Sequence, residues 1–298
     1  MPSPTLLPRR GTLLTSFAAV VAALLLLTAC STGSAETTAK SPPGGKDRTT
    51  ESSKSPTKST QTHNPAPPPK AGTCRELTFG AIGRYSNQAP TVDCGTSHTA
   101  LTFAVEQLPE DVAFEGVDIG NDAVQEKASL LCRAEFAKYI GGSAATRALS
   151  RLSVTYFVPT QQDFDAGSRW VRCDVIALQS ARILAALPET VEGFNDTDGA
   201  LDDYGVCSRG EPGTTDALLV MCNQEHEYRA LTALRLGADD ADYPGEKAVG
   251  EDGQSRCDDY ISDTLGLGGG YTYAWTYPSL DDWDAGQRFG FCWNKTGS

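Results

Sequence analysis

Ten residues that occur twice constrain the fold of this chain more than any other feature. The segment FDAGSRWVRC, residues 164–173, returns as WDAGQRFGFC, residues 283–292, with five identical positions and an aromatic residue at the head of each copy. Eight cysteines follow the first thirty residues, and they fall into two sets of four: Cys74, Cys94, Cys132, Cys173, and Cys207, Cys222, Cys257, Cys292. The offsets between matching cysteines fall steadily, through 133, 128, 125 and 119. We interpret the chain as a duplicated unit whose second copy has shorter loops.

The N-terminus has the pattern of an export signal. Arg9 and Arg10 precede the apolar run of residues 17–27, and Leu-Thr-Ala-Cys follows at residues 27–30. This pattern resembles the bacterial lipobox, which implies a signal peptide over residues 1–29. Cleavage before Cys30 would leave that thiol to carry the lipid, as in palmitate-bearing lipoproteins anchored on the outer face of the cell membrane. The alternative is an uncleaved transmembrane anchor, although the apolar run of residues 13–29 is at the lower limit for spanning.

Residues 30–72 have the composition of a disordered tether. Residues 31–72 contain no aromatic residue and no Leu, Ile, Val or Met, so they cannot bury enough apolar surface to offset the entropy of ordering. We expect no role for His63, which lies in this segment.

The charge of the chain excludes one class of partner. The formal charge is −13 overall, +2 over residues 1–30 and +3 over residues 31–72, which leaves −18 for residues 73–298. A surface this acidic repels nucleic acid and anionic lipid headgroups, so we expect neither as a direct ligand. Membrane contact is then expected through the lipid anchor alone.

The first unit, residues 73–178, has the pattern of a small antiparallel sheet with one helix. Alternating apolar residues predict a strand that carries Cys94 and His98 and continues to about residue 107. Residues 121–140 predict a helix that begins with an Asp122–Gln125 capping box and buries Cys132. Residues 152–158 and 169–178 predict two further strands, the first of which ends at Pro159.

The second unit, residues 206–298, repeats this order. A strand is predicted to carry Cys222 and His226, residues 255–266 predict a helix, and residues 271–277 predict a strand that ends at Pro278. Between the units, residues 179–205 are expected to be a solvated linker, with a short helix over residues 180–191. The expected fold class is α+β: two tandem repeats, each a small antiparallel sheet covered by one helix and stapled by two disulfides.

These motifs resemble the actinobacterial septum-formation family, the septum formation-related domain of envelope proteins. The pattern is V-x-C-x3-H, a helix with a central cysteine, a strand ending in Y-x-x-P, and an aromatic-x-x-G-x-R-x-x-C strand. In this chain the pattern is formed by Cys94, His98, Cys132, Pro159, Gly167 and Cys173, and again by Cys222, His226, Cys257, Pro278, Trp283, Gly286 and Cys292. Phe164 stands where the family has tryptophan, and no Gly-Asp pair precedes Cys74 or Cys207. The resemblance implies a place near the division septum and no established reaction.

The cysteines are expected to form disulfides, because an export signal leads to an oxidising compartment. Four cysteines per unit allow three pairings, which the sequence does not distinguish. We expect Cys74–Cys94 and Cys207–Cys222 to join early strands, and Cys132–Cys173 and Cys257–Cys292 to join helix and last strand.

His98 and His226 are the main candidates for a binding site. A cysteine four residues before a histidine can hold a metal, but disulfide formation removes the thiolates. We therefore expect no metal and no cofactor, and the main expectation is a structural histidine bonded to a backbone carbonyl. Binding of a protein or a small ligand is the first alternative.

Arg169, Arg288 and Trp283 are further binding candidates within the repeated decapeptide. The expected arrangement is a turn in which aspartate caps, glycine bends and arginine bonds a carbonyl or the aspartate. Aromatic residues gather near the second copy, at Tyr271, Tyr273, Trp275, Tyr277, Trp283, Phe289, Phe291 and Trp293. They are expected to fill the core, and the alternative is an exposed patch that stacks on sugars or a partner protein.

The sequence has no catalytic motif of a known class, so we expect a non-enzymatic lipoprotein. The chain lacks G-x-S-x-G, H-E-x-x-H and a phosphate-binding glycine loop. The main hypothesis is a binding or scaffolding module whose partner is an envelope or division protein or peptidoglycan. The alternatives are a wall hydrolase or transferase using His98 or His226 with nearby carboxylates, and a metal-capturing lipoprotein.

Overall fold

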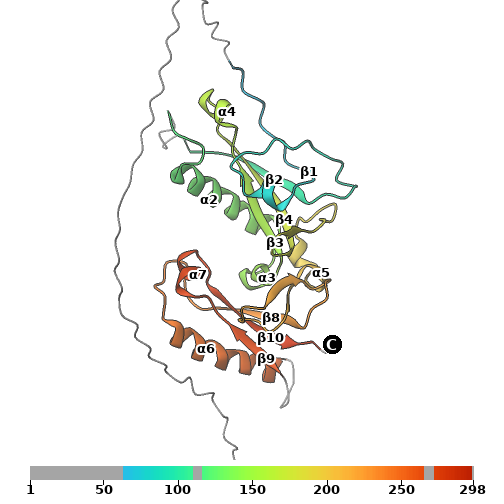
Figure 1. The fold of residues 1–298 in the computed structure, drawn as a ribbon, viewed down its shortest axis with the longest axis vertical. Helices are drawn as coiled ribbons and strands as arrows, with labels where there is room; N and C mark the ends of the chain where they lie inside the picture. Colours follow the sequence, from blue (N-terminus) through green and yellow to red (C-terminus); the bar gives the residue numbers. More distant parts are fainter. Residues whose placement is uncertain (1–62, 110–115, 265–271, 297–298) are drawn as a thin grey trace, which may run out of the picture. The chain divides into compact units, whose positions relative to one another are not determined.

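Two antiparallel sheets, each with a long helix on one face, form the described part of the protein (Figure 1). The computed structural model describes residues 63–109, 116–264 and 272–296. We call residues 63–205 the first body and residues 206–296 the second body. The expected signal peptide, the expected lipidation of Cys30 and the expected tether up to residue 62 lie outside the described residues. Within the described ranges, no helix is both long and apolar enough to cross a bilayer.

The first body is a sheet in the order β1-β2-β4-β3, with β5 beside the end of β4. Helix α2 begins after Asn121, whose side chain accepts a hydrogen bond from the Ala123 N–H, so the cap lies one residue before the expected Asp122. The elements are β1 (Thr73–Arg75), α1 (Phe79–Ile82), β2 (Ala100–Gln107), α2 (Asp122–Tyr139), α3 (Ala144–Ala148), β3 (Leu152–Phe157), α4 (Gln161–Asp165), β4 (Trp170–Ser180), β5 (Ile183–Leu184), the 3-10 turn η1 (Phe194–Asp196) and α5 (Ala200–Tyr204).

The second body is a sheet in the order β7-β6-β8-β10-β9. Its helix α6 begins at Glu246 rather than at residue 255, because Val249, Gly253 and Cys257 form one buried stripe that the two glycines in this segment had obscured. The elements are β6 (Val206–Arg209), β7 (Leu218–Met221), β8 (Tyr228–Arg235), α6 (Glu246–Asp259), the π-helical turn η2 (Tyr260–Thr264), β9 (Tyr273–Thr276), α7 (Leu280–Asp284) and β10 (Phe289–Lys295).

The two sheets correspond strand by strand. Strands β1, β2, β4 and β3 occupy the same order as β6, β8, β10 and β9. Val92 bridges Cys74 at the position where Val220 of β7 pairs with Cys207 of β6. The disulfides are Cys74–Cys94, Cys132–Cys173, Cys207–Cys222 and Cys257–Cys292, which are the expected pairs. In each body one disulfide therefore fastens the long helix to a central strand, α2 to β4 in the first body and α6 to β10 in the second.

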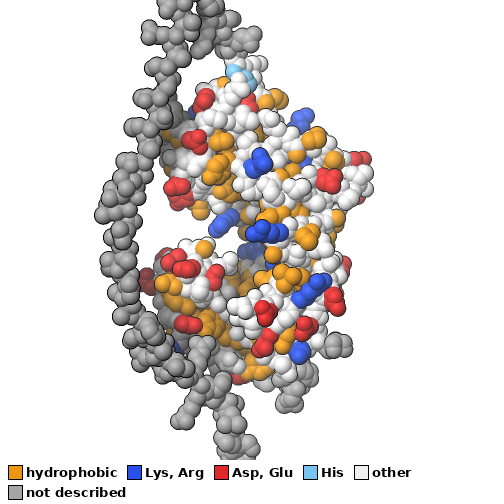
Figure 2. Space-filling model, viewed as in Figure 1, with side chains coloured by type: hydrophobic (Ala, Val, Ile, Leu, Met, Phe, Trp, Pro, Cys, Tyr) orange, Lys and Arg blue, Asp and Glu red, His pale blue; other side chains and the backbone are white. Residues whose placement is uncertain are grey.

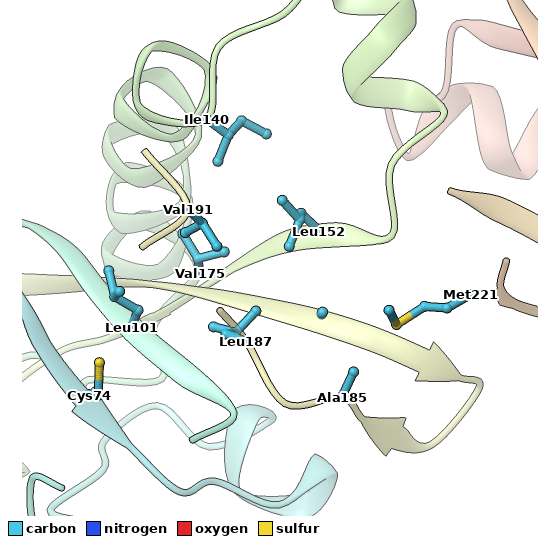
Figure 3. Close-up of a cluster of buried hydrophobic side chains, with 10 residues drawn as sticks. Cys74, Leu101, Ile140, Leu152, Val175, Ala185, Leu187, Val191 and Met221 are labelled. Carbon is cyan, nitrogen blue, oxygen red and sulfur yellow. The ribbon is translucent and has the colours of Figure 1, made fainter. Parts of the chain in front are cut away.

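Residues 179–205 pack on the first sheet, and the expected helix over residues 180–191 is wrong. Strand β5 pairs with the end of β4, and Ala185, Leu187 and Val191 lie in the core with Leu101 (Figure 3). Pro188 explains the difference, since proline disfavours helix at the residue before it and donates no hydrogen bond. The apolar residues of this segment fill a gap in the core instead.

Hydrogen bonds and one buried side chain join the two bodies. The Val206 N–H donates to the Leu149 carbonyl at 2.9 Å, and Gln179 Nε2 donates to Gln224 Oε1 at 2.9 Å. Met221 of β7 lies in the core cluster of the first body, where it is 1 % exposed (Figure 3). The start of β6 is therefore attached to the residues that lead into β3.

The last residues of the expected tether also pack on the first body. His63 Nε2 lies 2.7 Å from Asp163 Oδ1, and the Ala66 N–H donates to the same oxygen at 3.0 Å. The Gly72 N–H donates to the Thr102 carbonyl at 2.8 Å. The expectation of disorder is thus wrong for residues 63–72, because backbone and histidine hydrogen bonds hold a segment that has little apolar surface. His63, expected to have no role, is one of these contacts.

Candidate functional site

The two candidate histidines occupy the same turn in the two bodies. Each follows the second cysteine of its body by four residues and precedes β2 or β8. His98 Nδ1 donates to the Thr96 carbonyl at 2.8 Å, and His226 Nδ1 donates to the Gln224 carbonyl at 2.7 Å. The expectation that these histidines lie on strands is wrong, because the disulfide-linked cysteine starts a turn that ends only at the strand. The carbonyl bond of the main structural expectation is present in both.

Among the described residues, these histidines have few polar partners. His98 is 1 % exposed and its Nε2 has no hydrogen-bond partner, while His226 is half-buried. Neither ring bonds a carboxylate or a hydroxyl in the described ranges. The described residues also contain no group of three His, Cys, Asp or Glu side chains that could hold a metal ion. In this arrangement each histidine stabilises its own turn.

The repeated decapeptide forms a turn in both bodies, and the expected bond from arginine to a carbonyl is present. The expected aspartate cap is wrong, because Asp165 and Asp284 end α4 and α7, whose caps are Thr160 and Ser279. Arg169 Nη1 donates to the Phe164 carbonyl at 2.6 Å, and its guanidinium lies 4.1 Å from the centre of the Phe164 ring. Arg288 bonds the Trp283 carbonyl in the same way and lies 4.3 Å from the Trp283 ring. In the first copy Gly167, which lies between Phe164 and Arg169, has φ of +102°, a conformation that favours glycine.

Trp283 is a structural residue of this turn. Its side chain is 2 % exposed, and its Nε1 donates to the Ala241 carbonyl at 2.8 Å. Arg288 and Trp283 contact each other, but no contact given for the described residues links them to Arg169, His98 or His226. The five candidates therefore do not form one site.

A hollow of about 540 Å³ lies beside the second sheet, on the face away from α6. Phe289, Phe291 and Trp293 of β10 line it, and the half-buried Phe289 and Phe291 are accessible there. We call this hollow the β10 groove. Its walls come from the β6–β7 loop, the end of β9 and the segment between α3 and β3: Pro212, Gly213, Thr276, Tyr277, Ala148, Arg151 and Leu152. The space-filling view shows hydrophobic side chains near the level of α3 and α7 (Figure 2).

Several polar groups in the β10 groove are already used within the protein. Trp293 Nε1 donates to Thr276 Oγ1 at 2.8 Å, and Arg151 Nε donates to the Leu178 carbonyl at 2.9 Å. Asp282 accepts from the hydroxyl and N–H of Ser279, and these hydrogen bonds hold the pKa of the Asp282 carboxyl below its usual value. The groove consequently offers apolar contact more than free hydrogen-bonding groups.

The first sheet carries a buried ionic cluster that our sequence interpretation missed. Arg172 Nη2 lies 3.0 Å from Asp174 Oδ2, and Thr102 donates to Asp174 Oδ1 at 2.6 Å. Arg75 Nη1 donates to Thr102 at 2.7 Å. Burial raises the pKa of Asp174 and lowers that of Arg172, while their mutual attraction opposes both changes. The alternation of Arg172 and Asp174 within an otherwise apolar strand was the signal that could have revealed the cluster.

The fold and its crosslinks define a class: a disulfide-stabilised α+β protein of an oxidising, extracytoplasmic compartment. The family model described as septum formation matches residues 50–292. The chain therefore belongs to the septum formation family, which implies a role in division. The match is one continuous span that includes both bodies. No curated protein and no solved structure matches the chain.

Proposed function

We propose that this chain is a lipid-anchored, non-catalytic binding module that acts at the outer face of the cell membrane, near the division septum or cell wall. The observation that carries the binding role is the β10 groove, whose accessible walls are mainly apolar and several of whose polar groups are engaged. Such a surface holds a partner without supplying a nucleophile or a proton relay. Membership of the septum formation family supports the septal location.

The anchor and the repeats complete the proposal. Cys30 follows a lipobox-like pattern and takes the lipid, and the polar residues 31–62 separate it from the folded part. The two bodies are septum-formation-like domains, residues 73–178 and 206–298, that arose by duplication. Their common strand order and matching disulfides support this origin.

Imaging of the full-length chain in its own cells tests the septal role. A C-terminal fluorescent fusion that folds in oxidising compartments should be enriched at division sites, and deletion of the gene should delay septum completion. Even distribution over the envelope together with normal septa in the deletion strain would contradict the proposal.

Detergent partitioning tests the anchor. The wild-type chain should enter the detergent phase, whereas Cys30→Ala should move to the aqueous phase or remain unprocessed. Thr28→Ala is the matched control, since it changes a neighbouring residue and keeps the thiol. A Cys30→Ala chain that partitions and is processed like wild type would contradict lipidation.

A further inference from the structure

Strand β9 is an open edge of the second sheet. It pairs only with β10, in a register that places Thr276 opposite Phe291 and Ala274 opposite Trp293. The Lys295 N–H donates to the Thr272 carbonyl at 3.1 Å, so residues 272, 274 and 276 direct their backbone groups to β10. The N–H and C=O groups of Tyr273 and Trp275 therefore point away from the sheet. Among the residues that the structure describes, none bonds these groups.

Three hollows surround this edge and form one surface. The β10 groove lies on the face away from α6, and a hollow of about 540 Å³ continues it past Pro212, Trp275 and Leu280. A third, of about 520 Å³, lies on the α6 side between Glu246 and Trp275. Tyr277 borders all three. An extended chain laid along β9 would have a hollow on each of its two faces.

The two faces differ in chemistry. On the β10 side the accessible walls are the rings of Phe289 and Phe291. On the α6 side the hollow is lined by Glu246 and Glu251, both exposed, beside Lys247. Because successive side chains of a strand point to opposite faces, this surface fits a segment in which large apolar residues alternate with basic ones.

The charge and composition of the chain limit the occupant. Residues 31–62 contain no large apolar side chain, so they cannot fill the β10 groove. A second copy brings another −18 over residues 73–298. Exposed acids line the hollows at Asp282, Glu246 and Glu251, and these repel an acidic partner.

We propose that the β9 edge is the docking site of this binding module for an extended segment of another envelope protein, in which large apolar residues alternate with Lys or Arg. The segment adds as a sixth strand beside β9 and bonds the free backbone groups of Tyr273 and Trp275. Its apolar side chains enter the β10 groove and its basic side chains face Glu246 and Glu251. This inference rests on the proposed binding function and names its surface and partner class.

Peptide binding to the full-length chain, purified with its disulfides formed, tests whether the site recognises alternating apolar and basic residues. The probe is a fluorescent nine-residue peptide of alternating Val and Lys, measured by anisotropy. One control peptide has the same composition with the valines in one block, and another has Glu in place of Lys. We expect the alternating basic peptide to bind at least tenfold more tightly than either control. Equal affinity for all three would overturn the proposal.

Protein variants locate the site. Tyr273→Pro removes an outward N–H and keeps the pairing of β9 with β10, and Phe289→Asp places a charge in the groove. Each should weaken peptide binding at least tenfold. Leu218→Asp is the matched control, because Leu218 is an exposed leucine on β7, the opposite edge of the same sheet. It should change affinity less than twofold. Near-ultraviolet circular dichroism and melting temperature establish folding, and Phe289→Asp carries the test if Tyr273→Pro does not fold.

Three results would overturn the inference. An equal loss of peptide affinity in Phe289→Asp and Leu218→Asp would show that added charge weakens binding wherever it is placed, so that no specific site exists. Binding of a β-1,4-linked N-acetylglucosamine tetramer that Phe289→Asp abolishes, with no peptide binding, would assign the groove to glycan. A dimer in sedimentation that Tyr273→Pro dissociates would assign the edge to a second copy. Septal enrichment without peptide binding would leave the proposed function standing, whereas peptide binding with even distribution would remove the septal role alone.

Discussion

The two sheets differ most on the face turned away from their long helices. In the first body this face holds the buried ionic cluster. Strand register identifies which residues of the second body correspond to the residues of this cluster. The matching face of the second sheet is mainly apolar. Arg75, Thr102, Arg172 and Asp174 correspond to Ser208, Ala230, Phe291 and Trp293. The same strand order therefore carries a sealed polar interior in one body and an accessible apolar surface in the other.

Loop length explains the difference. Cys74 and Cys94 are 20 residues apart, whereas Cys207 and Cys222 are 15 apart. The longer connection includes α1 and packs Leu77, Ala81 and Ala89 against the first sheet. The shorter β6–β7 loop brings Pro212 and Gly213 over only part of the second sheet, and it leaves Phe289 and Phe291 accessible. The shorter connection thus leaves an apolar surface accessible on the second body.

Removing the acid of the ionic cluster should give the largest loss of stability. Asp174→Ala leaves Arg172 and Arg75 buried without their shared counter-charge. We expect the free energy of unfolding of the first body to fall by about 3–5 kcal/mol. Urea unfolding followed by circular dichroism measures it. Asp284→Ala, an exposed acid of the second body, should change the value by less than about 0.5 kcal/mol. Equal effects would mean that the cluster is not sealed from water.

Replacing the matched histidines should also cost more stability in the first body than in the second. His98→Ala removes a buried ring and its carbonyl bond, so we expect a loss of about 2–3 kcal/mol. His226→Ala removes a half-buried ring with the same bond and should cost about 1 kcal/mol. Thermal unfolding measures both. A phenotype at the septum in a His226→Ala strain whose protein is as stable as wild type would instead revive a functional histidine.

Two glycines of α6 should respond in opposite ways to alanine. A Cβ at Gly253 would lie 1.9 Å from the Trp275 ring, so Gly253→Ala should destabilise the second body by about 1–3 kcal/mol. Gly250 has space, with the nearest atom at 3.4 Å, and Gly250→Ala should stabilise the helix by about 0.5–1 kcal/mol. The first body has Ala128 at the position of Gly253 and the smaller Tyr156 at that of Trp275. Stabilisation by Gly253→Ala would contradict this packing.

The smallest loss of stability should come from changing Asp163, the residue in the first turn of α4 that binds His63 and Ala66. The His63 hydrogen bond, with those of Ala66 and Thr160, keeps the pKa of Asp163 below its usual value. The folded protein therefore binds this proton less readily than the unfolded chain. The stabilisation is complete above about pH 4–5 and is lost as pH falls through the lowered pKa.

Asp163→Asn should consequently cost about 1 kcal/mol at pH 7 and less at pH 3. Unfolding curves between pH 3 and pH 7 measure this. Asp282→Asn is the counterpart, because the Asp282 carboxyl has its Ser279 cap bonds and no histidine. Asp282→Asn should also cost more stability at pH 7 than at pH 3, and the cost should be smaller than that of Asp163→Asn. A loss for Asp163→Asn that grows as pH falls would contradict the assignment.

Much of the fold could be predicted from the sequence, because its strongest signals are local. Period-two alternation identified β2, and Pro159 and Pro278 identified the ends of β3 and β9. Repetition of the decapeptide predicted two matching bodies. The signals that misled were local too: Leu187 and Val191 have helical spacing, but tertiary packing on β4 determined their structure.

The candidate surface was harder to predict because it depends on contacts between distant segments. The sequence favoured His98, His226 and Trp283, residues that repeat, and the structure uses them to stabilise turns. The β10 groove depends instead on a feature that the two bodies do not share, the shorter connection between Cys207 and Cys222. Only the aromatic alternation at Phe289 and Phe291 indicated it.

The pairing of the cysteines also bears on how the chain matures. Each disulfide joins two cysteines that are neighbours in chain order, with none skipped. A protein threaded N-terminus first into an oxidising space presents its thiols in that order. With Cys30 taken up by the lipid, as we propose, an oxidase that couples each newly arrived thiol to the one before it would form the four native bonds in turn. Maturation of this chain should need an oxidant and no disulfide isomerase.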